Sequence, residues 1–493
     1  MDKLEKIVKK LSEPEYQHLL ENVAGRKKNN PYHVLEFIRK EPWDEEALMK
    51  KLDVNLNAYY TLKSRLMDRV AVVLSQRPVN AIKEKVANVS ASIFEEDKFI
   101  SVKYLKELEK ELLEYDLSNE LIVVYKALAR HHIYEPEEYE KYDMLYNKHV
   151  AYSLAMEKAE DLLLMFIRNI GIYRLTRNPE DFEKILRIRR EIYNISELFK
   201  SHRLFVLNNI ISIYFNCIFI TDLAELKQME MQVDGVLKKF ESIFKKYDLD
   251  VFYHNLKPLI NFMYVQYYYT IGSIPRGNAY YKLLKVSLPD IVGKHSYNFY
   301  VIMLLRAKLE KYIVDGNLDE LTDLNKLLES KFVIDEVEAY HCFTYGLFRT
   351  YIKFFEGDYE GVEKIYKDMK GSLYLREYIN GDIQLKLILA LCFSLLGEEE
   401  KCKKVFASID RQIDLDNPEN NNINLFIKFL KNVTKHAEYN RKLKKSRELF
   451  DEFNKANAGT NRILRFINFD EDMIIKLASY NRKNITNKGK DKL

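Results

Sequence analysis

The chain has 493 residues, 47% of them hydrophobic and 31% charged, which excludes an intrinsically disordered protein. Its formal net charge of +4 is nearly neutral at this length, so a protein whose main task is to wrap nucleic acid is not expected. The 15 glycines and 10 prolines are too few for a many-stranded β-protein, and the four cysteines form no CxxC pair. We therefore expect an all-α protein without a disulfide framework or a zinc site.

The amino terminus is amphipathic and lacks the apolar stretch of a signal peptide. The most hydrophobic segment, residues 204–220, is interrupted by Asn208, Asn209 and Asn216, whereas a bilayer span needs about 18 apolar residues. This segment is expected to be a buried helix. The protein is accordingly predicted to be cytoplasmic, with no membrane partner.

Residues 1–75 are expected to form a small N-terminal helical module. Residues 44–70 resemble a helix-turn-helix, with Asn55 as the cap of the second helix. The resemblance implies that four polar side chains near the start of this helix meet base edges and that three basic ones meet phosphates. The first group is Asn57, Tyr60, Thr61 and Ser64, and the second is Lys63, Arg65 and Arg69.

A second interpretation of the same helix is that it only packs against its neighbours. Five apolar residues at helical spacing form one stripe along it: Tyr59, Leu62, Leu66, Val70 and Val73. Asp68 lies on the outer face, where it would repel phosphate, and Asp53 stands where such motifs favour glycine. The sequence leaves both interpretations open.

Residues 76–100 lose strong periodicity and are predicted to connect the module to a helical repeat array over 101–415. Within this array, Gly316, Gly357 and Gly397 each end an apolar helix, and an acidic residue and a new amphipathic helix follow. The glycines are 41 and 40 residues apart (357 − 316 and 397 − 357). A fixed period near 40 residues is typical of stacked helix pairs.

Residues 300–415 resemble the tetratricopeptide repeat family. The segment "GDYEGVEKIYKDM" places Gly357, Tyr359 and Tyr366 at that family's preferred positions. Ala390 and Cys402 occupy its small-residue positions and Phe406 its aromatic position, although these units are longer than the family's repeat. The resemblance implies a right-handed α-solenoid that binds a protein or peptide on a concave surface.

The carboxyl-terminal part is predicted to cap the array. Residues 414–424 are rich in asparagine and are expected to form a loop. Residues 425–480 are predicted to be capping helices, since terminal repeats need a polar outer face. The last segment, 481–493, is basic and is expected to be a flexible tail.

No motif for a catalytic, metal or cofactor site is present in the sequence. The adjacent His131 and His132 would point about 100° apart on a helix and are expected to be structural or solvent-exposed. The first hypothesis is therefore a non-catalytic scaffold that binds a protein or peptide and needs no cofactor. The second is a transcriptional regulator that reads DNA with residues 1–75 and uses the repeats as a sensor or for dimerisation. An enzyme whose site assembles from distant helices is a third, weaker hypothesis.

Overall fold

The computed structural model describes eight positions before residue 29 and most of residues 29–488. The eight are 4, 8, 9, 16, 17, 19, 20 and 23, and the later gaps are 41–43, 76–77, 91–92, 94–96, 221–222, 248–249, 287–297, 332–337, 373–374, 436–437 and 458–461. In this part of the chain every regular element is a helix, and there is no strand. The prediction of an all-α fold is confirmed.

The helices form two compact units, which we describe separately. Unit 1 comprises 1–161, 194–207 and 235–257, and unit 2 comprises 162–193, 208–234 and 258–493. The helices before residue 271 are α3 (Asn30–Lys40), α4 (Glu45–Leu52), α5 (Leu56–Ser75), α6 (Pro78–Ala87), α8 (Lys98–Glu114), α9 (Ser118–His131), α10 (Pro136–Thr176), α11 (Pro179–Phe199), α12 (His202–Phe219), α13 (Leu223–Gln228), α14 (Glu230–Lys246) and α15 (Val251–Thr270). Several of the longer helices, α10 among them, contribute residues to both units.

Unit 1 contains two separate apolar clusters. The first includes residues of α3, α4 and α5, such as Leu48, Tyr59 and Leu66, and gives the N-terminal module a core of its own. The second joins α6 to α8, α9 and the start of α10, and Ile82 of α6 is buried in it. Part of the predicted connecting segment 76–100 is thus the packed helix α6, whose few apolar residues still reach the cluster.

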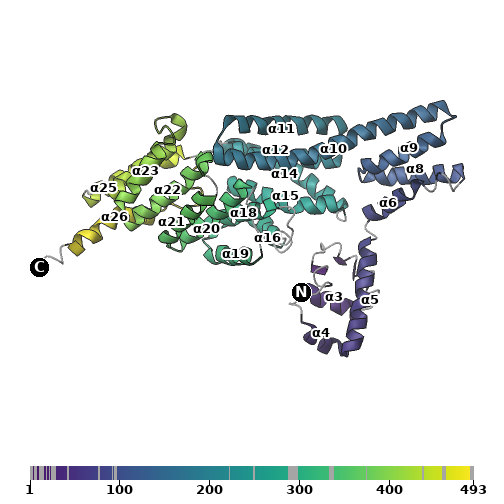
Figure 1. Cartoon of the computed structure of the whole chain (residues 1–493), viewed down its shortest axis with the longest axis horizontal. Helices are drawn as coiled ribbons and strands as arrows, with labels where there is room; N and C mark the ends of the chain where they lie inside the picture. The colour runs from purple at the N-terminus through teal and green to yellow at the C-terminus, as the bar shows by residue number, and fades with distance from the viewer. Residues whose placement is uncertain are drawn as a thin grey trace. The chain divides into compact units, whose positions relative to one another are not determined.

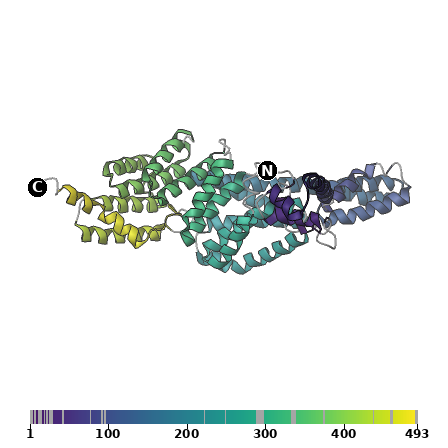
Figure 2. The ribbon, with the colours of Figure 1, turned by 90° about the horizontal axis from the view of Figure 1, so that it is seen from below.

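Unit 2 ends in a series of helices that pack as pairs. They are α16 (Ile274–Val286), α18 (Asn298–Asp315), α19 (Leu318–Lys331), α20 (Ala339–Phe355), α21 (Tyr359–Ser372), α22 (Ile379–Leu396), α23 (Glu399–Asp410), α24 (Asn421–Thr434), α25 (Tyr439–Ala456) and α26 (Glu471–Lys488). Each first helix contacts its own second helix, and α18, α20, α22 and α24 contact one another in that order. The labelled pairs α20–α21 and α22–α23 are visible in Figure 1, and Figure 2 shows the same green to yellow helices from below.

The glycines singled out in the sequence end the first helices of three pairs. Gly316, Gly357 and Gly397 have φ angles of 68°, 77° and 73°. After Gly397 the amide of Glu398 donates to the carbonyl of Phe393 over 2.9 Å. This bond closes the helix in the left-handed manner that glycine favours. The matching residue after Gly357, Asp358, makes the same bond to Lys353, also over 2.9 Å.

The small-residue positions lie where α22 and α23 come close. Ala390 and Cys402 are fully buried, and Cys402 Sγ lies 3.5 Å from the Ala390 carbonyl oxygen. Phe406, one turn further along α23, is also buried. Tyr359 is half-buried, and Tyr366 donates from its hydroxyl to Asp382 Oδ1 of α22 over 3.1 Å. These residues hold neighbouring helices together.

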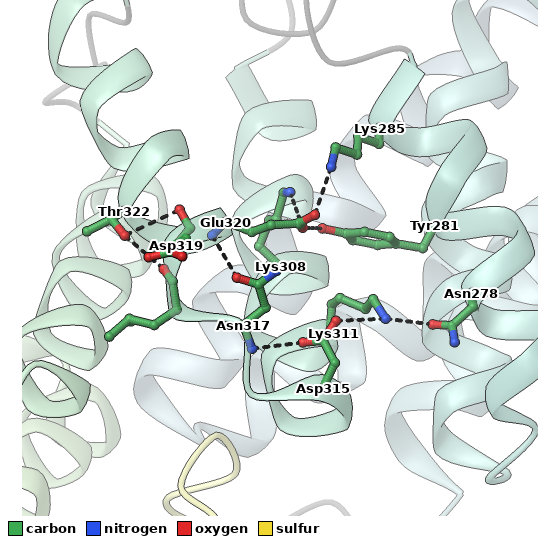
Figure 3. A network of polar contacts seen from close by, with 11 residues as sticks. Asn278, Tyr281, Lys285, Lys308, Lys311, Asp315, Asn317, Asp319, Glu320 and Thr322 are labelled. Carbon is green, nitrogen blue, oxygen red and sulfur yellow. Dashed lines mark hydrogen bonds and ion pairs between the residues drawn. The ribbon is translucent and has the colours of Figure 1, made fainter.

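A polar network ties α16, α18 and α19 together (Figure 3). Glu320 of α19 accepts bonds from Tyr281 Oη at 2.9 Å, Lys285 Nζ at 2.7 Å and Lys308 Nζ at 2.9 Å. Lys308 is only 4% exposed, so its charge depends on this carboxylate. The three donors in turn hold the pKa of Glu320 at about 2 even though burial opposes the shift. The network fixes the orientation of α18, whose opposite face lines a cavity.

Two helices of the carboxyl-terminal part, α22 and α26, need separate comment. Among the described helices, α22 is long and apolar enough to cross a membrane, but 78% of that window is buried inside the protein, as in a core helix. Helix α26 continues to Lys488, past position 481 where a flexible tail is predicted, because no breaker occurs before Gly489. Residues 489–493 lie outside the described part.

Replacing Gly397 by alanine is expected to lower the free energy of unfolding by roughly 1 kcal/mol, because a Cβ atom penalises the left-handed conformation. Gly235 is the matched control, since it is exposed within α14 and an added Cβ would meet nothing within 4 Å. Gly235→Ala should leave stability unchanged or raise it by up to about 1 kcal/mol. Chemical denaturation of both variants checks this. Equal effects of the two substitutions would contradict it.

Candidate functional site

The N-terminal module contains a helix, a tight turn and a second helix. Helix α4 is capped by Asp44, whose Oδ1 accepts from the amides of Glu46 and Ala47 at 3.0 and 3.1 Å. Asp53 ends α4 with a φ of 51°, a conformation that aspartate tolerates better than most residues. Asn55 Oδ1 accepts from the Ala58 amide over 2.9 Å, so Asn55 caps α5 as predicted.

The side chains assigned to base contacts are all on the surface of the module. Asn57, Tyr60, Thr61 and Ser64 are exposed, and so is Arg65. Lys63, in contrast, is half-buried and pairs with Glu45 Oε1 of α4 over 2.7 Å. The side chains of Asp68 and Arg69 lie outside the described part. Near the start of α5 these polar side chains are therefore uncovered, and Lys63 is not among them.

Unit 2 encloses a cavity of about 840 Å³ that the sequence does not reveal. Helices α10, α12, α15, α18, α20 and α22 contribute to its wall, together with residues 462–466 before α26. Its lining combines apolar side chains and tyrosines with five arginines and one acidic residue. The charged residues are Arg174, Arg177, Arg306, Glu310, Arg462 and Arg465. Small-molecule sites commonly have volumes of roughly 300–1,000 Å³, so the cavity fits a small ligand or the end of a peptide.

Two guanidinium groups meet at one uncharged oxygen inside the cavity. Arg174 Nη1 of α10 donates to the hydroxyl of Tyr340 over 3.0 Å, and Arg306 Nη1 of α18 donates to the same hydroxyl over 3.4 Å. The Nε atom of Arg306 is buried and has no hydrogen-bond partner among the described residues. Burial and the positive charge of Arg174 both lower the pKa of Arg306. The pair thus has more donors and more positive charge than one phenol satisfies.

The charge of the two arginines acts on Tyr340. Burial alone would raise the pKa of this phenol, but Arg306 and Arg174 outweigh it and bring the pKa down to about 8. The helices around Tyr340 also bring Tyr214 of α12 close, and burial raises the pKa of that residue. Tyr340 therefore ionises more readily than an ordinary tyrosine.

Backbone contacts hold both ends of this cluster. The Asn380 side chain of α22 donates to the carbonyl of Arg174 over 2.6 Å, which fixes the end of α10. A Cβ added at Gly171, one turn earlier, would lie 2.6 Å from Cδ1 of Tyr340, so glycine lets the ring pack on the backbone of α10. The tyrosine and its two arginines are consequently held in place from both sides.

The segment after α25 supplies a third guanidinium group. The side-chain amide of Asn457 makes two bonds with the backbone of Ile463, at 3.0 and 2.8 Å. Two residues later, Arg465 Nη2 lies 2.8 Å from Glu310 Oε1 of α18. Glu310 is the single carboxylate among the described lining residues, and it forms an ion pair with Arg465. Arg174 and Arg306 are left without a carboxylate partner among the described residues.

The titratable side chains of the described lining are arginines, tyrosines, one glutamate and one cysteine. The described lining includes no histidine, and burial raises the pKa of its one thiol, Cys217, to about 12. No group of three metal-ligating side chains occurs among the described residues, and His132 instead bonds to Glu135 Oε2 over 2.8 Å. The convergent arginines are suited to holding an anion.

Sequence reasoning missed this site because its charged residues come from distant segments. Position 306 offered one signal, since "VIMLLRAKL" places an arginine inside an apolar run. An arginine on a buried face usually needs a partner. The partners of Arg306 are, however, far away in the sequence, and no spacing rule predicts that these residues meet.

One tyrosine is expected to ionise near pH 8 when the protein is titrated and tyrosinate absorbance is recorded. As the pH rises through this value, Tyr340 loses its proton because the two guanidinium groups stabilise the anion. Tyr340→Phe should abolish this early step. Tyr351→Phe is the matched control, because burial raises the pKa of Tyr351. An early step that survives Tyr340→Phe would contradict the assignment.

Comparison with known proteins gives no assignment for the chain. No protein-family model, no curated protein and no solved structure matches it. The functional conclusions therefore depend on the residues themselves.

Proposed function

We propose that the protein is a non-catalytic scaffold that binds another protein or a peptide, and that the arginine-lined cavity of unit 2 receives part of this partner. The observation that carries the proposal is the cavity itself, with five arginines and one glutamate within apolar and tyrosine walls. Its volume of about 840 Å³ accommodates the end of a chain and not a folded domain. The partner thus inserts a short segment.

The proposed scaffold is a right-handed α-solenoid of the tetratricopeptide kind. Two features support it: the glycines that recur after 41 and 40 residues (357 − 316 and 397 − 357), and the contacts between successive first helices. Stacked pairs present side chains of several first helices on one surface. Arg306 of α18, Tyr340 of α20 and Gln384 of α22 line the cavity in this way.

Absence of catalysis is part of the proposal, and the residue types of the described lining support it. General acid–base work at neutral pH usually uses histidine or a carboxylate with an altered pKa. The described lining offers one carboxylate, which an arginine already pairs, a thiol that burial keeps protonated, and the Tyr340 hydroxyl, which two arginines engage. We therefore favour binding over the hypothesis of an enzyme assembled from distant helices.

Peptides selected from a random library against the full chain are expected to bind in the cavity. Ile313 lines the cavity and is half-buried, so Ile313→Trp would occupy part of its volume. We expect this substitution to weaken the selected peptides by about tenfold or more, equivalent to about 1.4 kcal/mol. Fluorescence anisotropy measures the change.

Leu198→Trp is the matched control, because Leu198 is 74% exposed and does not line the cavity. It should bind the peptides as the natural chain does. A library that yields no binding peptide, or peptides that bind the Ile313 variant equally well, would count against the cavity as the binding surface.

A second candidate function, a transcriptional regulator, is favoured by one specific observation. The polar side chains of α5 that a recognition helix would use are exposed beyond a capped three-residue turn. Under this proposal Asn57, Tyr60, Thr61 and Ser64 meet base edges, and Arg65 meets a phosphate. The repeats would then act as the sensor of the bound peptide or in dimerisation.

Binding to random duplex DNA at two salt concentrations tests this candidate. We expect weak affinity at low salt that falls as salt rises, since phosphate contacts release counterions. Arg65→Gln should weaken binding and lower the salt slope by about 1, as expected for one lost phosphate contact. Lys103→Gln, which removes an exposed charge from α8, should change neither. Absence of any affinity at low salt would exclude the DNA-binding function.

A further inference from the structure

The unsatisfied part of the cavity is the pair of guanidinium groups at Tyr340. Each guanidinium has five donors and matches the two oxygens of a carboxylate. Here both groups point at one phenol oxygen, at 3.0 and 3.4 Å, and the buried Nε of Arg306 has no partner among the described residues. A phenol accepts these bonds but does not balance two positive charges.

The surrounding residues supply only part of the missing negative charge, because the one nearby carboxylate, Glu310, acts on Arg174 without a direct bond to it. Glu310 is the acidic residue of the described lining, and Arg465 holds it at 2.8 Å. Removing charges from water is costly unless an opposite charge and hydrogen bonds compensate. An anion that enters the cavity would provide both at the position where Arg174 and Arg306 converge.

We propose that the cavity binds a peptide through a carboxylate whose oxygens replace the Tyr340 hydroxyl as the partner of Arg174 and Arg306. This inference rests on the proposed function and names the chemical class of the partner: a short peptide with an acidic end, supplied by its terminal carboxyl group or by a terminal acidic side chain. Charge complementarity selects this occupant from among possible peptides.

The walls define the rest of the ligand. Apolar side chains of α18 and α20, among them Leu309, Ile313 and Leu347, line the cavity next to the arginines. They favour apolar side chains in the residues that precede the carboxylate, because burial of apolar area stabilises the complex. The expected ligand is therefore apolar along its length and anionic at its end.

The pKa of Tyr340 is expected to change when the peptide binds. In the free protein, the two guanidinium groups lower the pKa of its phenol. A carboxylate bound to the same groups neutralises their effect and adds a negative charge beside the phenol. The charged and titratable groups that face Tyr340 are Arg174, Tyr214 and Arg306. Burial raises the pKa of Tyr214, and burial together with Arg174 lowers that of Arg306.

The test uses the full chain and a fluorescein-labelled tetrapeptide with three leucines followed by aspartate and a free carboxyl terminus. The comparison peptide ends in asparagine amide, and a third ends in aspartate amide. We expect the first peptide to bind at least tenfold more tightly than the asparagine amide. The third peptide distinguishes the side-chain carboxylate from the terminal one. Inorganic phosphate serves as a competitor that carries only the anionic charge.

Arg174→Gln and Arg306→Gln should each weaken the acidic peptide at least tenfold and the neutral one much less. Arg168→Gln is the matched control on α10, since Arg168 is 67% exposed and lies outside the cavity lining. If the variants do not fold, the natural chain still gives a result, because saturating acidic peptide should move the early tyrosinate step to higher pH.

Each other result overturns the inference in a distinct way. Equal affinity for the acidic and neutral peptides would exclude the carboxylate but leave the proposed peptide-binding function intact. Phosphate that binds more tightly than the acidic peptide would assign the cavity to a small phosphorylated ligand. Binding of neither peptides nor library-selected sequences would remove the inference and the proposed function together.

Discussion

Arg174 and Arg306 both donate hydrogen bonds to the hydroxyl of Tyr340, and this interaction constrains how the helices of unit 2 pack around the cavity. Three helices, α10, α18 and α20, must approach closely for these side chains to meet. Glycine at position 171 permits the approach of α10, since an added Cβ would lie 2.6 Å from the tyrosine ring. The cost of holding two cations together is offset by the phenol in part, and we propose that a ligand offsets the remainder.

The network around Glu320 explains why α18 has a fixed orientation. Lys308 faces away from the cavity and is held by Glu320, whereas Arg306 and Glu310 face into it. A rotation of α18 that moved Arg306 out of the cavity would also withdraw Lys308 from its carboxylate. Figure 3 shows Lys308 bonded to Glu320. The buried lysine thus acts as a positioning residue for the cavity, and one helix carries both a structural and a proposed binding face.

The sequence was informative where structure depends on nearby residues. The scarcity of glycine and proline predicts the helical class, and helix, glycine and acidic residue in succession predict the left-handed ends at Gly316, Gly357 and Gly397. The sequence also predicts Asn55 as a cap, because the amide it bonds lies only three residues away. Periodicity was less useful at residues 76–100, where α6 packs on its neighbours with few apolar residues.

Contacts between residues far apart in the sequence could not be predicted from it. Arg174, Arg306 and Arg465 come from separate parts of the chain, and the apolar period that places each on a helix face says nothing about which faces meet. Leu464 adopts a left-handed conformation, with a φ of 52°, and the next residue, Arg465, pairs with Glu310. Because position 464 is not a glycine, the sequence does not predict this turn. Lys63 illustrates the same limit, since its pairing with Glu45 across the turn removes it from a face where its charge had suggested DNA.

The central claim is that Arg174 and Arg306 bind a carboxylate inside the cavity of unit 2. A crystal structure of the full chain with the acidic tetrapeptide tests it most directly. The account predicts carboxylate oxygens within hydrogen-bond distance of both guanidinium groups and a Tyr340 hydroxyl that no longer bonds to them. A peptide bound elsewhere, or an unchanged Arg174–Tyr340–Arg306 cluster with the peptide in the cavity, would contradict it.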